Sequence, residues 1–391
     1  TTKGLDFANA LQYGRDNGEA LRKMTFQERG LMIKALAMYL LERKERYYEV
    51  SYRTGATRID SWIDIEGGIG NLFANASLRR QFGNDSHYVD GEYAPLGKNG
   101  TFIGHHIMVP KEGVAVHINA YNFPIWGMLE KVAVNLLAGI PAVVKPSEYT
   151  SYLTELMLKE IIDSGILPDG SIQMVSGLGR GILDYVTSED VITFTGSAHT
   201  GKKLKALPNI LENSVPFNLE ADSLNATMLG EDSGPGTAEF DLFVKSTRAE
   251  ITVKAGQKCT AIRRILVPEK YMEDVQIALG KQLAKTTIGD PSVEGVRMGP
   301  LASRTQVDRV RENVELLMKE QEVVYGDMDN FDIVGGDKEK GAFFSPILFR
   351  NDAPFEKTRV HEIEAFGPVS TLMPYKDMDE AVRIAEMGKG S

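Results

Sequence analysis

The chain of 391 residues has a single cysteine, Cys259, and six scattered histidines. One cysteine excludes an intramolecular disulfide, and so few soft ligands argue against a zinc site built from Cys and His. The sequence also lacks a basic run, and 44 Lys and Arg against 54 Asp and Glu give a formal charge of −10. Phosphate backbones repel a chain of that charge, so we expect no nucleic-acid partner.

Long apolar runs are missing too. The longest nearly apolar stretch, Val132 to Val144, contains Asn135 and Pro141. It falls short of the roughly 18 residues that a membrane-spanning helix needs. The N-terminus has no apolar core of the signal-peptide kind, so we expect no membrane partner and a cytoplasmic location. Because the first residue is Thr rather than Met, we interpret the chain as processed or partial.

The overall composition is that of a globular protein. Hydrophobic residues make up 42% and charged residues 25%, which excludes disordered and collagen-like classes. The length predicts two or three domains.

Short apolar segments alternate with helix-like segments between residues 114 and 220. The pattern predicts strands at 114–119, 142–145, 172–175, 191–195 and 215–220, and helices at 123–138, 150–164, 181–186 and 200–207. Such alternation is typical of a mostly parallel sheet covered by helices on both faces. The carboxyl ends of its strands then share one edge, where ligands bind.

The remaining segments complete an α/β prediction. Helices are expected over 25–50, where Thr25 and Glu28 form a capping box, and over 56–78. Residues 81–99 are rich in Gly, Asn and Asp and predict a loop or hairpin. A second alternation predicts helices at 239–255, 272–286 and 304–321, with strands at 264–267 and 342–349. We therefore expect two packed domains, residues 1–223 and 224–391, with a cleft between them.

Cys259 is the first candidate for chemistry. Lys258 precedes it, Gly256 lies three residues earlier and polar Thr260 follows. A thiol attacks as the thiolate, which nearby positive charge or backbone N–H groups stabilise. The alternative is a small buried hydrophobe, which is what a lone cysteine most often is.

Glu220 and Asn122 each follow or end a predicted strand. A partly desolvated Glu220 carboxylate at a sheet edge suits a general base, although a surface acid or helix cap explains the residue better when it is taken alone. The Asn122 amide can donate a hydrogen bond to an oxyanion, although an Asx turn before Pro124 is an equal alternative.

Three further segments are candidates for binding phosphate or ribose. Lys145 directly follows an apolar strand in the run 145–148, Lys-Pro-Ser-Glu. The stretch 193–201 joins a strand to a helix through Gly196 and Gly201, and N–H groups at a helix start hold phosphates. The run 177–181 is also rich in glycine. The GxGxxG fingerprint is absent, and each segment is equally explained as a turn.

Taken in order, these motifs resemble the aldehyde dehydrogenase superfamily. The resemblance rests on Asn122-Phe-Pro124, Lys145-Pro-Ser-Glu148, Phe194-Thr-Gly-Ser197, Leu219-Glu220, Gly256-Gln-Lys-Cys259 and Glu364-Ala-Phe-Gly-Pro-Val369. It covers most of the chain. It implies an α/β aldehyde dehydrogenase-like fold of two Rossmann-like parallel-sheet domains with the active site in the cleft between them. Residues 1–223 would bind the cofactor, and residues 224–391 would form a catalytic domain that is incomplete at its C-terminus.

The resemblance also implies residue roles. Cys259 would be the nucleophile, Asn122 with the Cys259 backbone N–H would form the oxyanion hole, and Glu220 would activate water. Lys131 matches a lysine often found near the active site. The positions that would bind the cofactor, which is NAD or NADP, are Lys145, Ser147, Glu148, Gly196, Ser197, Glu364 and Phe366. Glu148 favours NAD because it would repel a 2′-phosphate, whereas the resemblance leans to NADP.

Within the superfamily, the segments 54–57, 60–70, 113–120, 194–198, 220–225 and 254–264 resemble the aldehyde dehydrogenase domains of bifunctional ring-opening enzymes of phenylacetate catabolism. That branch implies a CoA-linked semialdehyde substrate and a homo-oligomer. The semialdehyde dehydrogenases of the benzoyl-CoA pathway are an alternative. A CoA-acylating dehydrogenase is another, but such enzymes commonly lack the glutamate that Glu220 matches. A non-catalytic descendant of the fold is the third alternative, and the intact set Cys259, Asn122 and Glu220 argues against it.

Overall fold

A computed structural model describes residues 2 and 4–389, which divide into two compact units. The first unit takes the chain up to Val50 and then Trp62–Ala221, and the second takes Ser51–Ser61 and the chain from Asp222 onward. The sequence analysis assigned residues 51–61 to the first domain. The structure instead builds this short segment into the second unit.

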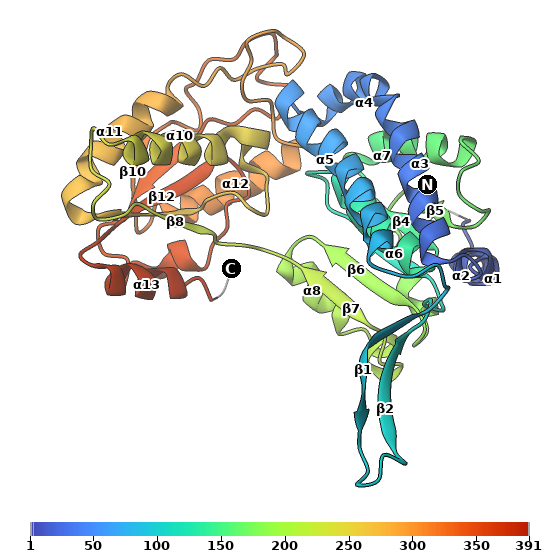
Figure 1. The fold of residues 1–391 in the computed structure, drawn as a ribbon. Coiled ribbons are helices and arrows are strands. Elements are labelled where there is room, and N and C mark those ends of the chain that lie inside the picture. The colour runs from blue at the N-terminus through green and yellow to red at the C-terminus, as the bar shows by residue number, and fades with distance from the viewer. Residues whose placement is uncertain (1, 3, 390–391) are drawn as a thin grey trace. The chain divides into compact units, whose positions relative to one another are not determined.

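The first unit contains a five-stranded parallel sheet (Figure 1). Its strands lie in the order β5 (Ile172–Met174), β4 (Ala142–Lys145), β3 (Ala115–Ile118), β6 (Val191–Thr195) and β7 (Phe217–Glu220). Every neighbouring pair is parallel, as the alternation predicted. The carboxyl edge of this sheet therefore carries Lys145, Thr195 and Glu220 together.

Helices cover both faces of this sheet. Val144 of β4 belongs to a core with α3 (Phe26–Leu41), α6 (Trp126–Ala138) and α7 (Ser151–Asp163), whereas its neighbour Val143 packs with Leu11 of α1 (Phe7–Asn17). A strand buried on both faces needs apolar residues at successive positions, which explains the unbroken run at 142–144. The helices α8 (Ala198–Lys205) and α9 (Pro208–Glu212) complete the unit's parallel-sheet part.

The predicted helix over 25–50 is interrupted in the structure. The capping box of Thr25 and Glu28 starts α3 as expected, but α3 ends at Leu41 and α4 (Lys44–Ser51) follows it. The short α2 (Glu19–Arg22) precedes α3, and α5 (Arg58–Ser77) follows α4. Of the loop and hairpin considered for residues 81–99, the structure has a hairpin. It pairs β1 (Tyr88–Pro95) with β2 (Ile103–Met108) as a separate antiparallel ribbon (Figure 1).

The second unit has its own five-stranded sheet, in the order β10 (Glu322–Tyr325), β11 (Ile347–Arg350), β12 (Val369–Tyr375), β9 (Arg264–Pro268) and β8 (Ala226–Met228). Only β10, at one edge, runs antiparallel. The accompanying helices are α10 (Ala238–Thr252), α11 (Met272–Leu283), α12 (Arg304–Leu317) and α13 (Met378–Glu386). The strand predicted over 342–349 begins only at Ile347, because Pro346 has no N–H for a ladder. The sequence analysis did not anticipate β8, β10, β12 or α13.

His117 is an ionisable side chain at the centre of the first unit. It lies on β3 without solvent exposure, and its ring contacts the Asn135 side chain of α6. Burial lowers the pKa of His117 from 6.5 to about 3, and the nearby positive charge of Lys131 adds to that shift. The imidazole is therefore neutral in the folded protein at any ordinary pH.

The state of His117 makes stability depend on pH. Below pH 6.5 the unfolded chain binds a proton at His117, whereas the folded chain binds that proton only near pH 3. The free energy of unfolding therefore falls as the pH drops. His117→Gln should flatten this dependence by up to about 1.4 kcal/mol per pH unit. Denaturant unfolding at pH 4 to 7 measures it. His106→Gln, on the exposed hairpin, is the control and should leave the wild-type slope intact; equal slopes for all three proteins would refute the assignment.

Candidate active site

Five of the seven residues predicted to hold a cofactor lie at or just after the carboxyl edge of the first sheet. Lys145 ends β4 with its side chain largely buried, and its Nζ donates to Glu148 Oε1 at 2.9 Å. Gly179, with a left-handed φ of +60°, lies against it, since a Cβ there would sit 3.0 Å from Lys145 Cγ. Ser147 is buried in the same turn. The glycine-rich run 177–181 thus packs directly on the lysine.

Gly196 and Ser197 connect β6 to α8 at the same edge. Ser197 is the N-cap of α8, and its hydroxyl accepts a hydrogen bond from the Thr200 N–H at 3.3 Å. A Cβ at Gly196 would lie 2.8 Å from the Phe194 ring, so a larger residue there would require the ring to move. The connection begins a helix, and the N-terminus of a helix attracts anions such as phosphate.

Asn122 lies in the loop between β3 and α6, and its side chain is buried. The loop is fixed at its end, because Asp64 Oδ1 accepts hydrogen bonds from the N–H groups of Ile125 and Trp126 at 3.0 and 2.8 Å. Its middle is tied to the next loop by Thr150, whose hydroxyl donates to the Tyr121 carbonyl. The Asn122 amide is therefore held on a rigid support. Lys131, further along α6, is paired with Glu130 at 2.6 Å.

Glu220 lies where the sequence predicted it, but its side chain is more exposed to solvent than expected. It is the last residue of β7 as predicted, and its Oε2 accepts a hydrogen bond from the Thr195 hydroxyl at 3.3 Å. The expected partial desolvation was wrong, since the side chain is exposed. The reason is that β7 is the edge strand of its sheet, which leaves one side of the residue open to water.

In the second unit, three loops meet at the amino edge of the sheet. Residues 222–225 lead into β8, residues 256–263 into β9 and residues 364–368 into β12, and these strands are parallel neighbours. Cys259 is on the middle loop and is exposed. Its carbonyl accepts hydrogen bonds from Ser223 Oγ at 2.5 Å and Asn225 Nδ2 at 2.7 Å. The loop before β8 thus fixes the backbone of the cysteine.

The backbone before Cys259 is unusual. Lys254, Ala255 and Gly256 have φ values of +54°, +50° and +67°, so three consecutive residues adopt the left-handed conformation. That conformation is unfavourable for residues with a Cβ. At Gly256 no Cβ could fit, because it would lie 2.1 Å from the Gly367 carbonyl oxygen. Strained backbone of this kind clusters at functional sites.

Lys258 was a candidate source of positive charge for the Cys259 thiol. In the structure its side chain is buried and its Nζ forms a 2.6 Å ion pair with Glu250 of α10. Its charge is thus compensated by a carboxylate. The pair anchors the residue next to Cys259 to the helix that precedes the loop.

Arg263 joins the cysteine loop to the segment 364–367. Its guanidinium donates to the carbonyls of Gly256 at 2.9 Å and Gly367 at 2.8 Å, and to Glu364 Oε1 at 3.2 Å. It also lies over the Phe366 ring, with 5.4 Å to the centroid. Sequence reasoning missed this residue. The signal was the pair Arg263-Arg264 at the start of β9, where charged residues directly precede an apolar run.

Glu364 is therefore engaged on both oxygens. Oε1 accepts from Arg263, and Oε2 accepts from the Ser223 N–H at 3.2 Å. Burial raises the pKa of Glu364, and the Arg263 charge opposes that rise. The structure thus brings Cys259, Glu364 and Phe366 into one network within the second unit, with Arg263 at its centre.

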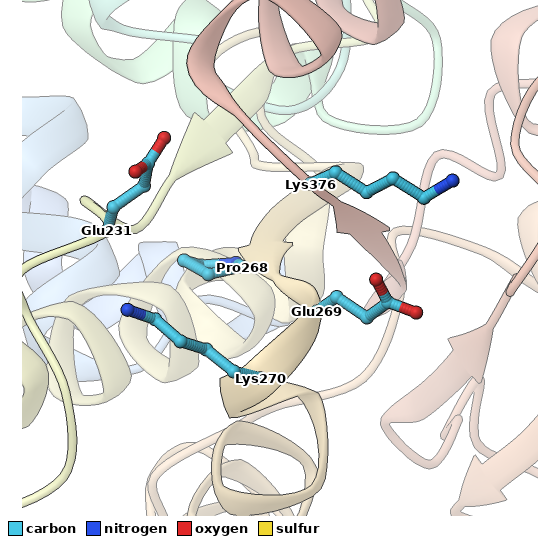
Figure 2. Close-up of a pocket in the computed structure, with 5 residues that line it drawn as sticks. All are labelled: Glu231, Pro268, Glu269, Lys270 and Lys376. Carbon is cyan, nitrogen blue, oxygen red and sulfur yellow. The ribbon is translucent and has the colours of Figure 1, made fainter.

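A cavity of about 440 Å³ lies at the opposite, carboxyl edge of the second sheet (Figure 2). Its lining comes from the end of β9 and from the segments that follow β8, β9 and β12, and consists of Glu231, Pro268, Glu269, Lys270 and Lys376. No predicted site residue lines it. Within residues 2 and 4–389, no group of three or more His, Cys, Asp or Glu is arranged to hold a metal, and no helix is long and apolar enough to cross a membrane.

Comparison with known proteins identifies the class. The model of the aldehyde dehydrogenase family matches residues 2–389. A 3,4-dehydroadipyl-CoA semialdehyde dehydrogenase of Aromatoleum evansii is 42% identical over all of this chain and 76% of its own length. Among solved structures, a betaine aldehyde dehydrogenase of Staphylococcus aureus in complex with NAD+ has a TM-score of 0.84 at 25% identity, over 98% of this chain and 73% of that one.

A succinic semialdehyde dehydrogenase of Streptococcus pyogenes with NADP+ shares the fold. Its TM-score is 0.83 at 21% identity, over 99% of this chain and 80% of that one. The chain belongs to the aldehyde dehydrogenase family and is an oxidoreductase. The resemblance drawn from the motifs is confirmed.

The ion pair of Arg263 and Glu364 makes a stability prediction. Arg263→Met leaves a buried carboxylate without its cation, and we expect the unfolding free energy of the second unit to fall by about 3–5 kcal/mol. Replacing both residues, Arg263→Met with Glu364→Gln, should recover part of the loss. Denaturant unfolding followed by circular dichroism measures each variant.

Arg311→Met is the matched control, because its ion pair with Asp329 lies at the surface and should contribute little. If Arg263→Met were as mild as this control, Arg263 would not be the centre of the network.

Proposed function

We propose that this protein oxidises an aldehyde to a carboxylic acid with NAD or NADP, using Cys259 as the nucleophile. The observation that carries the proposal is the state of Cys259. It is the only cysteine of the sequence, its side chain is exposed, and its loop is fixed by the left-handed turn, by Asn225 and by Arg263. A thiol that served only for packing would be buried.

In the first chemical step, the Cys259 thiolate attacks the carbonyl carbon of the aldehyde and forms a thiohemiacetal. The carbonyl oxygen gains negative charge as the C–S bond forms. The Asn122 side-chain amide and the Cys259 backbone N–H are the proposed donors to that oxygen. Donors held in place before the reaction need no reorganisation, and the fixed loops around both residues support this role.

A nicotinamide cofactor held by the residues named below would supply the acceptor for the hydride that leaves the former aldehyde carbon. The enzyme then carries an acyl group on Cys259 as a thioester. Glu220 is the proposed general base that takes a proton from water as the water oxygen attacks the thioester carbon. The C–S bond breaks, the carboxylic acid leaves and the Cys259 thiolate is regenerated.

The residues at the carboxyl edge of the first sheet fit a dinucleotide. The start of α8 presents a helix N-terminus, which attracts phosphate, and Lys145 contributes a cation that is paired with Glu148. We propose that Lys145, Ser147, Glu148, Gly196 and Ser197 contact the cofactor from this unit. Glu364 and Phe366 would contact it from the second unit.

The proposed substrate is a CoA-linked semialdehyde produced by aromatic ring cleavage. The name of the Aromatoleum evansii relative, whose match covers the whole of this chain, supports that class. Glu220 supports hydrolysis of the thioester by water rather than transfer of the acyl group to free CoA, because the hydrolytic step needs a base.

Glu220→Gln tests the proposal. Removing the base should leave the first turnover, seen as a burst of reduced cofactor, and slow steady-state turnover by about 100-fold or more. Stopped-flow absorbance of the reduced cofactor measures both phases. Glu212→Gln, an exposed glutamate on α9, is the matched control and should behave like wild type.

Cys259→Ser should abolish the burst and the turnover together, without a shift in thermal midpoint. If Glu220→Gln turned over normally, or if turnover needed free CoA, a CoA-acylating reaction would replace the hydrolytic one.

Glu148→Gln tests the cofactor site. The Glu148 carboxylate is the proposed partner of the ribose, where its charge disfavours a 2′-phosphate. Neutralising it should improve kcat/KM for NADP relative to NAD by about tenfold, because one like-charge contact is removed. Steady-state kinetics with both cofactors measure the ratio. An unchanged ratio would place Glu148 away from the ribose.

A further inference from the structure

The segment Ser51–Ser61 is far in sequence from the rest of the second unit, yet it is built closely into that unit. Gly55 lies against the backbone of residues 299–300. A Cβ at Gly55 would sit 2.5 Å from the Pro300 carbonyl oxygen, and a Cβ at Gly299 would sit 2.1 Å from the Gly55 carbonyl oxygen. Two glycines thus permit direct backbone contact, which fixes the segment in place.

Asp60 is the residue of this segment that reaches the cysteine loop. Its side chain is buried, and Oδ1 accepts a hydrogen bond from the Lys254 N–H at 2.7 Å. Oδ2 accepts from the Thr57 N–H at 2.9 Å and from the Thr57 hydroxyl at 2.8 Å. Hydrogen bonds that a buried carboxylate accepts are short and strong. The Thr54 hydroxyl adds a 3.3 Å bond from Lys254 Nζ.

The N–H that Asp60 holds belongs to the first residue of the left-handed turn. Helix α10 ends at Thr252, and Lys254, Ala255 and Gly256 then adopt the left-handed conformation. The last of them, Gly256, lies three residues before Cys259. Two of these residues carry a Cβ, so the chain adopts the turn only when its surroundings stabilise it. Arg263 stabilises the end of the turn through the Gly256 carbonyl, and Asp60 stabilises its beginning.

We propose that Asp60 is a positioning residue for catalysis, which holds the left-handed turn so that Cys259 is presented to the aldehyde. The inference rests on the proposed role of Cys259 as nucleophile. A purely structural role is the competing explanation, because Asp60 also bonds Thr57 at the start of α5. The two explanations differ in what happens at residues 254–259.

The experiment compares Asp60→Ala with Thr57→Ala, which removes the hydroxyl at the start of α5 but leaves the contact between Asp60 and Lys254. The first readout is hydrogen exchange of the peptide covering residues 254–259, followed by mass spectrometry. It is independent of activity. We expect Asp60→Ala to accelerate exchange there at least tenfold, and Thr57→Ala to change it less than threefold.

The second readout is turnover with a CoA-linked semialdehyde. Asp60→Ala should lower kcat at least tenfold with KM within threefold of wild type. Ala255→Gly makes the left-handed conformation favourable, so adding it to Asp60→Ala should restore kcat by at least threefold. A merely structural role predicts no such rescue, because the added glycine does not repair the start of α5.

Asp60→Asn covers the case in which the alanine variant does not fold. It keeps an oxygen for the Lys254 N–H but loses the charge, and we expect an intermediate loss of kcat. Unchanged exchange at 254–259, or rapid exchange with unchanged kcat, overturns the proposal while Cys259 keeps its role. Wild-type turnover that survives Cys259→Ser overturns the proposed function instead, and it does so whatever the exchange data show.

Discussion

The left-handed turn at Lys254, Ala255 and Gly256 is the constraint on which the organisation of the second unit depends. Because Gly256 approaches the Gly367 carbonyl too closely for any side chain, it fixes the distance between the loops that enter β9 and β12. Arg263 then has carbonyls from both loops within reach, and Glu364 neutralises it. The inserted segment 51–61 supplies the carboxylate that begins the turn. The buried side chains of Arg263 and Asp60, the latter supplied by the segment 51–61, thus stabilise the same left-handed turn.

The candidate site residues lie at opposite edges of the two sheets, at the carboxyl edge of the first and at the amino edge of the second. In the first unit the candidate residues Lys145, Ser197 and Glu220 lie where parallel strands end, which is the usual ligand-binding edge of an open α/β sheet. In the second unit Cys259 and Glu364 lie where strands begin, and the cavity at the carboxyl edge contains neither. The first arrangement suits a dinucleotide, which needs helix starts and glycine-rich loops. The second suits a nucleophile, because the Cys259 loop is bonded on both sides to the loops that enter the neighbouring strands β8 and β12.

The sequence predicted much of the first unit, because strands such as Ala142–Lys145 are buried on both faces and are therefore apolar throughout. The sequence did not predict the elements whose secondary structure depends on tertiary contacts. The strand Val369–Tyr375 contains Ser370, Thr371 and Pro374 and carries no clear periodicity, yet pairing on both sides stabilises it. For the site, motif order supplied Cys259, Asn122 and Glu220 as the proposed catalytic residues. It could not predict the exposure of Glu220, which follows from an edge strand, or the roles of Asp60 and Arg263, whose partners are distant in sequence.

The central claim is that Cys259 carries the acyl group during turnover. The direct measurement is peptide mass spectrometry of the wild-type protein, quenched with acid while it oxidises a CoA-linked semialdehyde. The account predicts an acyl mass on the peptide containing Cys259, present only when aldehyde and oxidised cofactor are both supplied and removed by hydroxylamine, which cleaves thioesters. An unmodified Cys259 peptide during active turnover, or an acyl mass on another peptide, would contradict it.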